Sequence, residues 1–359
     1  MKQLLTITII GILLSGPLSA SSSERQSPSI CIDRQDIVSV SDFFESVDVI
    51  LLETTEQSRI LSISKIIYFN NRYYIFDGQQ QKIFCFDSDG NFLFRISQRG
   101  EGPEEYLFLE DFNIDPFNNQ LLLLEPFGRL FVFDLDGNFI SVTRLPSEVR
   151  AYNEVFAIDE NRLLFSSLYT FGFIFYDRAT NTIIEQRHYV QNMALRLPDF
   201  PPLYRVHRYR GDLFLSLPLS NDVINLSDNS VFSWNFGELT NTTETVEQLR
   251  NTVLRASRSG RDSHFHDLSY DWVKEGHLNY FILRSFQTKR YKITHLLLAN
   301  YSIRFVYYDK KTGETFVFET TKEGIHLSPT YFHGESIIVR VWAHEQIGNP
   351  HLVRYNFKQ

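Results

Sequence analysis

Short apolar runs separated by turns rich in Asp, Asn and Gly alternate along most of the chain. Residues 82–92 (KIFCFDSDGNF) and 129–139 (RLFVFDLDGNF) share one plan, in which an Asp-x-Asp-Gly-Asn turn follows an apolar run. Asp-Gly is the preferred chemistry of a tight hairpin turn, and apolar runs of this length and composition are typical of strands. Both segments are therefore predicted to be β-hairpins.

The hairpin recurs at a nearly constant spacing. Its turn falls at six marker positions: Asp87, Asp134, Asp177, Ser227, Asp309 and Asn356. Four of the five intervals are 43 to 50 residues long, which matches one four-stranded propeller blade. A second hairpin precedes each marker, as in residues 63–77, so that every unit holds four strands. The sequence therefore predicts an all-β protein, a six-bladed β-propeller of four-stranded blades.

The ends of the chain predict how the ring closes. The sixth unit stops after Phe357, without its outermost strand, and the apolar residues 47–53 precede the first full unit. A strand formed by these N-terminal residues would complete the last blade and leave no open junction. We expect an N-terminal segment at residues 21–44 and the propeller at residues 45–359.

The fourth interval is longer than the others, at 82 residues. It holds one blade and an insertion at about residues 237–280, between blades 4 and 5. Residues 241–244 are a plausible helix start, and Val246, Leu249 and Val253 repeat with a helical period. The insertion is therefore predicted to carry a helix.

Residues 1–20 are predicted to be a secretory signal peptide. A charged start precedes an apolar run that is too short to span a bilayer, and small residues lead up to Ala20. An uncleaved anchor helix is the alternative. A lipid anchor is not expected, because Gly16 and Pro17 stand where a lipoprotein has its cysteine. We expect an exported protein, periplasmic or extracellular.

Composition excludes several classes of protein. Aromatic residues make up 15% of the chain, which favours half-buried strands over helix bundles. The formal net charge of −8 removes the basic surface on which nucleic-acid binding depends. After the leader, no apolar run approaches the ~18 residues of a membrane span. Two cysteines are too few for a disulfide scaffold; Cys31 and Cys85 could pair, but a strand-like run around Cys85 favours a buried free thiol.

The repeats, the leader and residues 99–106 (RGEGPEEY) together resemble the six-bladed β-propeller proteins exported by Bacteroidetes-type bacteria, which are similar to NHL-repeat propellers. The resemblance covers roughly residues 45–359. It implies an exported propeller with a role in glycan or peptide handling at the cell envelope. Many relatives carry a lipoprotein cysteine that this chain lacks, and the helical insertion need not be shared.

Propeller topology places two kinds of connection on one face around the channel mouth: those between successive blades, and those between the second and third strands of a blade. We call this the mouth face. Aromatic rings beside amides and charged groups suit sugar or peptide recognition, although loops are polar in any soluble protein. For residues 99–106 the alternative is an Arg–Glu bridge with Tyr106 packed between blades. The candidate ligand-binding residues are Asp77, Arg99, Glu101, Glu104, Tyr106, Glu125, Arg129, Tyr169, Tyr204, Asn221, Arg261, His264, His266 and His344.

Two patterns suggest metal ligands. His264 and His266 with Asp267 could hold a transition metal, although a solvated loop explains the same residues. The Asp-x-Asp-Gly-Asn turns resemble the opening of a calcium loop, but they lack its closing Glu, which favours plain hairpin turns. We therefore expect no resident cofactor, and a divalent cation is the alternative.

Catalytic motifs are absent from the sequence. It has no Gly-x-Ser-x-Gly elbow, phosphate-binding loop or dinucleotide fingerprint. We favour a binding module, expected to be monomeric, that recognises a glycan, a peptide or an envelope protein on the insertion and mouth face. A hydrolase or lyase at the channel mouth, with or without a divalent metal, is the first alternative. A structural scaffold in an envelope complex is the second.

Overall fold

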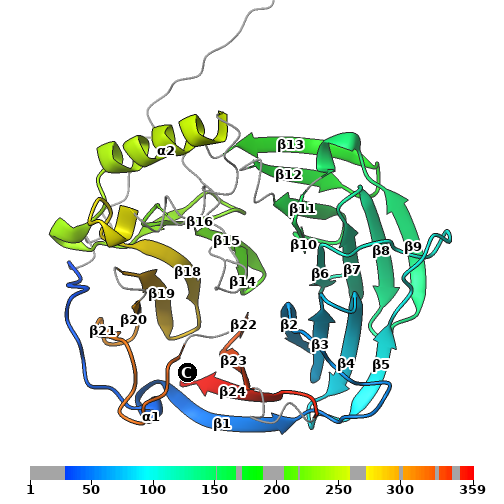
Figure 1. Ribbon diagram of the computed structural model, residues 1–359, viewed down its shortest axis with the longest axis horizontal. Helices are drawn as coiled ribbons and strands as arrows, with labels where there is room; N and C mark the ends of the chain where they lie inside the picture. Colours follow the sequence, from blue (N-terminus) through cyan, green and yellow to red (C-terminus); the bar gives the residue numbers. More distant parts are fainter. Residues whose placement is uncertain are drawn as a thin grey trace, which may run out of the picture.

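The computed structural model describes residues 29–150, 152–166, 172–188, 206–216, 219–258, 272–298, 302–327, 331–341 and 348–359. Six four-stranded antiparallel sheets form a ring around a central channel (Figure 1). The predicted six-bladed β-propeller is confirmed.

Each of the first five blades runs outward from the channel in chain order. Blade 1 consists of β2 (Lys65–Phe69), β3 (Arg72–Asp77), β4 (Lys82–Asp87) and β5 (Phe92–Ile96). Blade 2 consists of β6 (Asp111–Asp115), β7 (Gln120–Glu125), β8 (Arg129–Asp134) and β9 (Phe139–Arg144), followed by a 3-10 turn, η1 (Ser147–Val149). Blade 3 consists of β10 (Glu154–Ala157), β11 (Arg162–Ser166), β12 (Gly172–Asp177) and β13 (Thr182–His188). Blade 4 consists of β14 (Val206–Tyr209), β15 (Asp212–Ser216), β16 (Asp222–Asn225) and β17 (Val231–Ser233). Blade 5 consists of β18 (Phe281–Gln287), β19 (Tyr291–Leu297), β20 (Ile303–Asp309) and β21 (Thr315–Phe318).

Blade 6 joins the two ends of the described chain. Its strands are β22 (Tyr331–His333), β23 (Ser336–Val341), β24 (His351–Phe357) and, outermost, β1 (Phe44–Leu51). The antiparallel ladder between β1 and β24 runs from the pair Phe44 and Phe357 to the pair Leu51 and His351. The N-terminal strand therefore occupies the outer edge that the C-terminal part of the chain leaves open.

A segment ahead of β1 crosses two further blades. Residues 29–39, the N-terminal strap, lead into a short helix, α1 (Val40–Phe43). The Ile30 amide donates to the Asn235 carbonyl (2.8 Å), beside blade 4. Asp36 then pairs with Val317 on the outer strand of blade 5, through its amide (2.7 Å) and its carboxylate (2.8 Å). The strap thus links blades 4 and 5 to the closing strand.

The interval between blades 4 and 5 contains a 3-10 turn, η2 (Gly237–Leu239), and one long helix, α2 (Thr243–Arg258). The Thr242 hydroxyl accepts a hydrogen bond from the Thr245 amide (3.2 Å), which caps the start of the helix. Leu249 is fully buried and belongs to the same apolar cluster as Val273. Figure 1 shows α2 at the periphery of the ring, beyond β16.

Apolar side chains fill the junctions between neighbouring blades. On β3, Tyr73 and Ile75 face blade 6, whereas Tyr74 and Phe76 face blade 2. Because successive side chains of a strand point to opposite faces, both sets of residues must be apolar, and the strand reads as a continuous apolar run. Within the described residues, one such cluster lies at each of the six junctions.

Both cysteines are free thiols. Cys85 is buried between blades 1 and 2, and burial raises its pKa to about 12. Cys31 lies exposed in the N-terminal strap. The expectation of a buried free thiol at Cys85 is confirmed.

Candidate functional site

The segment 99–106 on the mouth face is held by its own contacts. Tyr106 is fully buried, its hydroxyl donates to the Gln81 carbonyl (2.8 Å), and its ring meets Phe131 edge to face. Arg99 donates from Nε to the Leu107 carbonyl (3.1 Å). Tyr106 therefore packs between blades 1 and 2, and its ring is not presented to a ligand.

Two candidate carboxylates are saturated by protein donors. Glu125 accepts both arms of a bidentate pair from Arg129 (2.6 and 2.7 Å) and a third hydrogen bond from the Leu107 amide (2.9 Å). Asp77 is fully buried and accepts backbone hydrogen bonds from residues 61, 62, 79 and 80. Both groups hold loops in place, and neither has a free oxygen to offer.

The remaining candidates divide into three groups. Glu101 and Glu104 are exposed on the surface of the segment 99–106. Asn221 accepts a hydrogen bond from the Tyr280 hydroxyl (2.7 Å) at the junction of blades 4 and 5. The others lie outside the described residues: Tyr169, Tyr204, Arg261, His264, His266, Asp267 and His344.

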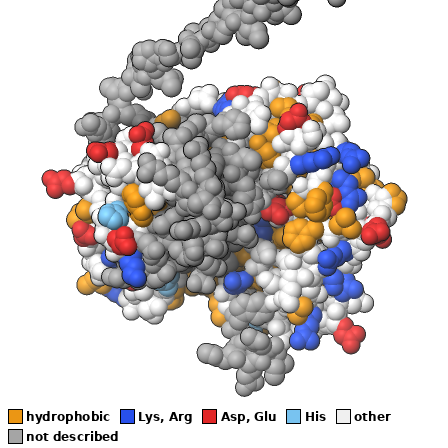
Figure 2. All heavy atoms as spheres, turned by 45° about the horizontal axis from the view of Figure 1, so that its top comes forward, with side chains coloured by type: hydrophobic (Ala, Val, Ile, Leu, Met, Phe, Trp, Pro, Cys, Tyr) orange, Lys and Arg blue, Asp and Glu red, His pale blue; other side chains and the backbone are white. Residues whose placement is uncertain are grey.

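Exposed apolar side chains accompany basic ones on the mouth face of blade 2. Phe127 is 63% exposed, and Leu107 and Phe108 are more than 40% exposed. Arg150 lies against Gly128. Figure 2 shows hydrophobic side chains beside Lys and Arg at the right of the molecule.

A buried ion pair ties the inner strands of neighbouring blades together. Lys65 Nζ on β2 lies 2.7 Å from an oxygen of Asp111 on β6, and both side chains are at most one-tenth exposed. The second Asp111 oxygen accepts from the Val155 amide on β10 (3.1 Å). Burial raises the pKa of Asp111, and the charge of Lys65 opposes this rise. The pair links blades 1, 2 and 3 at the channel.

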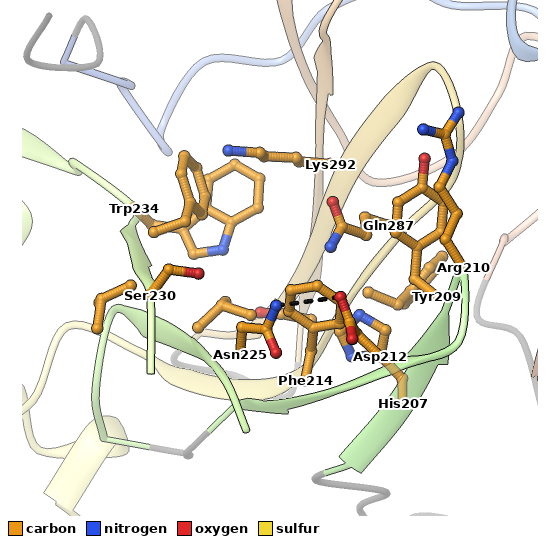
Figure 3. A pocket seen from close by; sticks show the side chains of 15 residues that line it. His207, Tyr209, Arg210, Asp212, Phe214, Asn225, Ser230, Trp234, Gln287 and Lys292 are labelled. Carbon is orange, nitrogen blue, oxygen red and sulfur yellow. Dashed lines mark hydrogen bonds between the residues drawn. The ribbon is translucent and has the colours of Figure 1, made fainter. Parts of the chain in front are cut away.

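A cavity of about 340 Å³ lies between blades 4 and 5 (Figure 3). Its lining residues come from the ends of strands: His207, Tyr209, Arg210, Asp212, Phe214, Val223, Asn225, Ser230, Val231, Phe232 and Trp234 from blade 4, and Ser285, Phe286, Gln287 and Lys292 from blade 5. Arg210 is in the turn between the first and second strands of blade 4, and Ser230 is in the turn between its third and fourth strands. In antiparallel blades these turns lie on the face opposite the mouth face. We call it the hairpin face.

The strands on the two sides of the cavity differ in length. The outer strands of blade 4, β16 and β17, have only four and three residues, whereas β18 and β19 of blade 5 have seven each. The hairpin of blade 4 is itself tight, with Arg210 in the left-handed region (φ 52°) before Gly211.

The cavity wall combines aromatic rings with polar groups. The rings belong to Tyr209, Phe214, Phe232 and Trp234. Asn225 donates from Nδ2 to Asp212 (3.3 Å) at one side of the cavity (Figure 3). This mixture, rings for stacking and a few polar groups for orientation, is typical of small-ligand sites.

Two buried polar groups in the wall have no hydrogen-bond partner among the described residues. One is the indole Nε1 of Trp234, a side chain that is only 3% exposed. The other is the imidazole of His207, whose two nitrogens are both unpaired and whose ring stacks on Phe214. Burial lowers the pKa of His207 to about 3, so that the ring is neutral and offers one donor and one acceptor.

Basic side chains lie over the aromatic rings of the cavity. Lys292 Nζ is 3.3 Å from the centroid of Phe232, and the Arg210 guanidinium is 5.3 Å from that of Tyr209. Lys310 approaches Tyr209 from outside (4.9 Å). Among the described residues, Asp212 is the only acidic one in the lining.

Comparison with known proteins agrees with this architecture. Residues 29–347 match the family model described as Domain of unknown function (DUF4934). The chain belongs to this family. No curated protein matches the sequence of this DUF4934 member.

Two solved structures share the fold of this DUF4934 protein. One is a Bacteroides fragilis protein provisionally described as exported, with 16% identity and a TM-score of 0.67 over 91% of this chain and 98% of that one. The other is a member of the DUF4221 family from Bacteroides vulgatus, with 14% identity and a TM-score of 0.52 over 90% and 99% of the two chains. At these identities the similarity shows the fold alone.

Two features are absent from the described part of this DUF4934 chain. None of its helices is both long and apolar enough to cross a membrane. No group of three or more His, Cys, Asp or Glu side chains in the same part is arranged to hold a metal ion.

None of the predicted residues that the structure describes lines the cavity in this DUF4934 protein. The prediction concentrated on the mouth face, whereas the cavity opens among the turns of the hairpin face. The feature of the sequence that could have pointed to the cavity is the weak fourth repeat, whose strands around Ser227 are short. It becomes informative only when blade 4 is compared with its longer neighbour.

Proposed function

We propose that this protein is an exported binding module that holds a sugar unit of a glycan in the cavity between blades 4 and 5. Export is supported by the signal peptide predicted at residues 1–20 and by the similar Bacteroides fragilis protein described as exported. The cavity volume is at the lower end of the range of about 300–1,000 Å³ that is usual for small-molecule sites. It suits one or two sugar rings.

The unpaired indole of Trp234 is the observation that carries the proposal. Buried donors and acceptors are nearly always paired, and leaving one unpaired costs about 1–3 kcal/mol. Trp234 and His207 place such groups in the same cavity wall, beside the Asp212 and Asn225 pair. Ligand hydroxyls would pair with them while the aromatic rings cover the apolar face of the sugar.

The test is a glycan array probed with labelled mature protein, followed by calorimetry on the glycans that bind. Trp234→Phe keeps an aromatic ring and removes the N–H donor, so affinity should fall by up to about tenfold. Trp272→Phe, a tryptophan outside the cavity, is the matched control and should bind as the wild type does. Thermal melts of both variants report whether the fold is intact.

Two results would contradict the proposal. One is the absence of any glycan binding by the folded wild type. The other is binding that Trp234→Phe and Asp212→Ala both leave unchanged, because the sugar site would then lie elsewhere on the protein.

A further inference from the structure

We propose that the cavity between blades 4 and 5 selects a sugar that carries a carboxylate, such as a uronic acid unit. This inference rests on the proposed function and names its ligand class. It follows from the charges, the hydrogen-bonding groups and the arrangement of the lining residues.

The charge of the cavity is opposite to that of the whole protein. The chain has a formal net charge of −8, yet the lining contains Arg210 and Lys292 against the single carboxylate of Asp212. Outside the lining, Lys310 adds a third cation near Tyr209, and Glu335 adds a second carboxylate that interacts with both residues. An acidic protein that gathers cations around a cavity raises the local concentration of anions there.

The hydrogen-bonding groups of the cavity wall also favour an anionic ligand. Lys292, Arg210 and the unpaired indole N–H of Trp234 are donors without acceptor capacity. A ligand that pairs with the indole N–H must offer an acceptor, and a carboxylate provides two oxygens in one plane. Hydrogen bonds to an ionised acceptor are shorter and about twice as strong as neutral ones.

The opposite side of the cavity suits hydroxyl groups. In Figure 3, Lys292 and the Arg210 guanidinium lie toward the upper side, and Asp212 with Asn225 toward the lower side. The Asp212 carboxylate accepts from Asn225 and has further lone pairs for ligand O–H groups. A sugar acid combines both needs, with a carboxylate at one end and ring hydroxyls at the other.

This arrangement also disfavours other anions. Asp212 would repel a doubly charged phosphate more strongly than a single carboxylate. An acidic peptide lacks the ring hydroxyls that would form hydrogen bonds with Asp212 and Asn225. It also has no flat apolar face to pack against Phe232 and Tyr209. The geometry therefore favours a sugar acid.

The experiment compares ligands that differ only in charge. Short oligomers of galacturonic, glucuronic and mannuronic acid, and their methyl esters, are titrated calorimetrically into the mature protein at 20 and 300 mM NaCl. The ester keeps the size and hydroxyls of the acid and removes its charge. We expect at least one acid to bind about tenfold tighter than its ester at low salt, with the ratio reduced at high salt.

Variants locate the selectivity in the cavity. Lys292→Gln and Arg210→Gln should each lower the acid-to-ester affinity ratio, and together they should bring it below about threefold. Lys274→Gln and Arg144→Gln replace exposed basic residues outside the cavity and serve as matched controls. The controls should keep the wild-type ratio.

Each other outcome overturns a defined part of the argument. Equal affinity for acid and ester, or binding of neutral glycans alone, overturns the carboxylate inference and leaves glycan binding standing. Binding of an acetylated triglutamate peptide but of no sugar overturns both and identifies the cavity as a peptide site. Binding of neither class by the folded protein overturns the proposed function itself.

Discussion

Buried polar side chains in this propeller have two different roles. Asp77 and Glu125 accept hydrogen bonds from several neighbouring donors, and each fixes a loop on the mouth face. Trp234 and His207 are buried without a partner among the described residues, and both line the same cavity. Other buried atoms without a partner among the described residues, such as the hydroxyls of Tyr73 and Tyr307, lie away from this cavity. It is the occurrence of two unpaired groups in one cavity wall that marks the site.

The Lys65 and Asp111 pair provides a stability prediction at the residue scale. Lys65→Met leaves the buried Asp111 carboxylate without its cation and should destabilise the protein by about 3–5 kcal/mol. Arg162→Met removes an exposed ion pair of similar length (2.6 Å) and should cost less than about 1 kcal/mol. Urea unfolding of both variants measures the difference. Similar losses in the two would show that burial adds nothing to the pair at Lys65.

His295 predicts a pH dependence of stability. It is 1% exposed in blade 5, and burial, together with the charge of Arg284, holds its pKa well below 6.5. The folded state therefore keeps His295 neutral while the unfolded chain takes up a proton below about pH 6.5, so stability falls as the pH falls. Between pH 7.5 and 5.0, His295→Met should lose about 2 kcal/mol less than the wild type. Equal losses in urea unfolding would contradict a neutral imidazole at this position.

At the scale of single elements, the N-terminal strap, α1 and β1 together connect blade 5 to blade 6. The strap pairs with the outer strand of blade 5, and β1 completes blade 6. Between them, Phe43 inserts into a group of rings that includes Tyr307 (4.8 Å), Phe316 (5.3 Å) and Phe318 (5.4 Å). The packing of this one side chain therefore joins two blades.

Phe43→Ala should accordingly be costly. Truncating a fully buried phenylalanine removes its packing and leaves a cavity, which typically costs about 3–5 kcal/mol. Ile37→Ala changes a strap side chain that is 79% exposed and should stay within about 0.5 kcal/mol of the wild type. Thermal and urea unfolding compare the two. A small effect of Phe43→Ala would mean that the strap and α1 are held mainly by backbone pairing.

The fold could be predicted from the sequence because the hairpin turn recurs at a regular spacing, with Asp at the marker position in four of the six units. Asp87 and Asp134 both accept backbone hydrogen bonds across their turns, which explains their regular spacing. The site was not readable in the same way. Tyr209 and Lys292 are far apart in the sequence, come from different blades and line the same cavity. The neighbouring blade decides whether the side chains of a turn line a cavity. A linear sequence motif does not record this.

At the scale of the whole molecule, closure of the ring depends on residues from both ends of the described chain. Seven residue pairs join β1 to β24, and Asp48 on β1 binds the Arg354 guanidinium on β24 (3.0 Å). Sheet edges that remain open expose unpaired backbone groups and invite association with other chains. The strap also packs Ile30 and Ile32 against Trp234, so the closing segment supports the wall of the cavity.

Removing residues 24–54 should therefore affect stability and binding together. Blade 6 loses its outer strand and the cavity wall loses its backing, so we expect the melting temperature to fall by at least about 10 °C. Glycan affinity should fall as well. A synthetic peptide of residues 29–54, added in excess, should raise the melting temperature of the truncated protein in proportion to the logarithm of its concentration, because it binds only the folded ring. An unchanged melting temperature after truncation would contradict closure by β1. A truncated protein that melts at a lower temperature but binds glycan normally would show that the cavity does not depend on the closing segment.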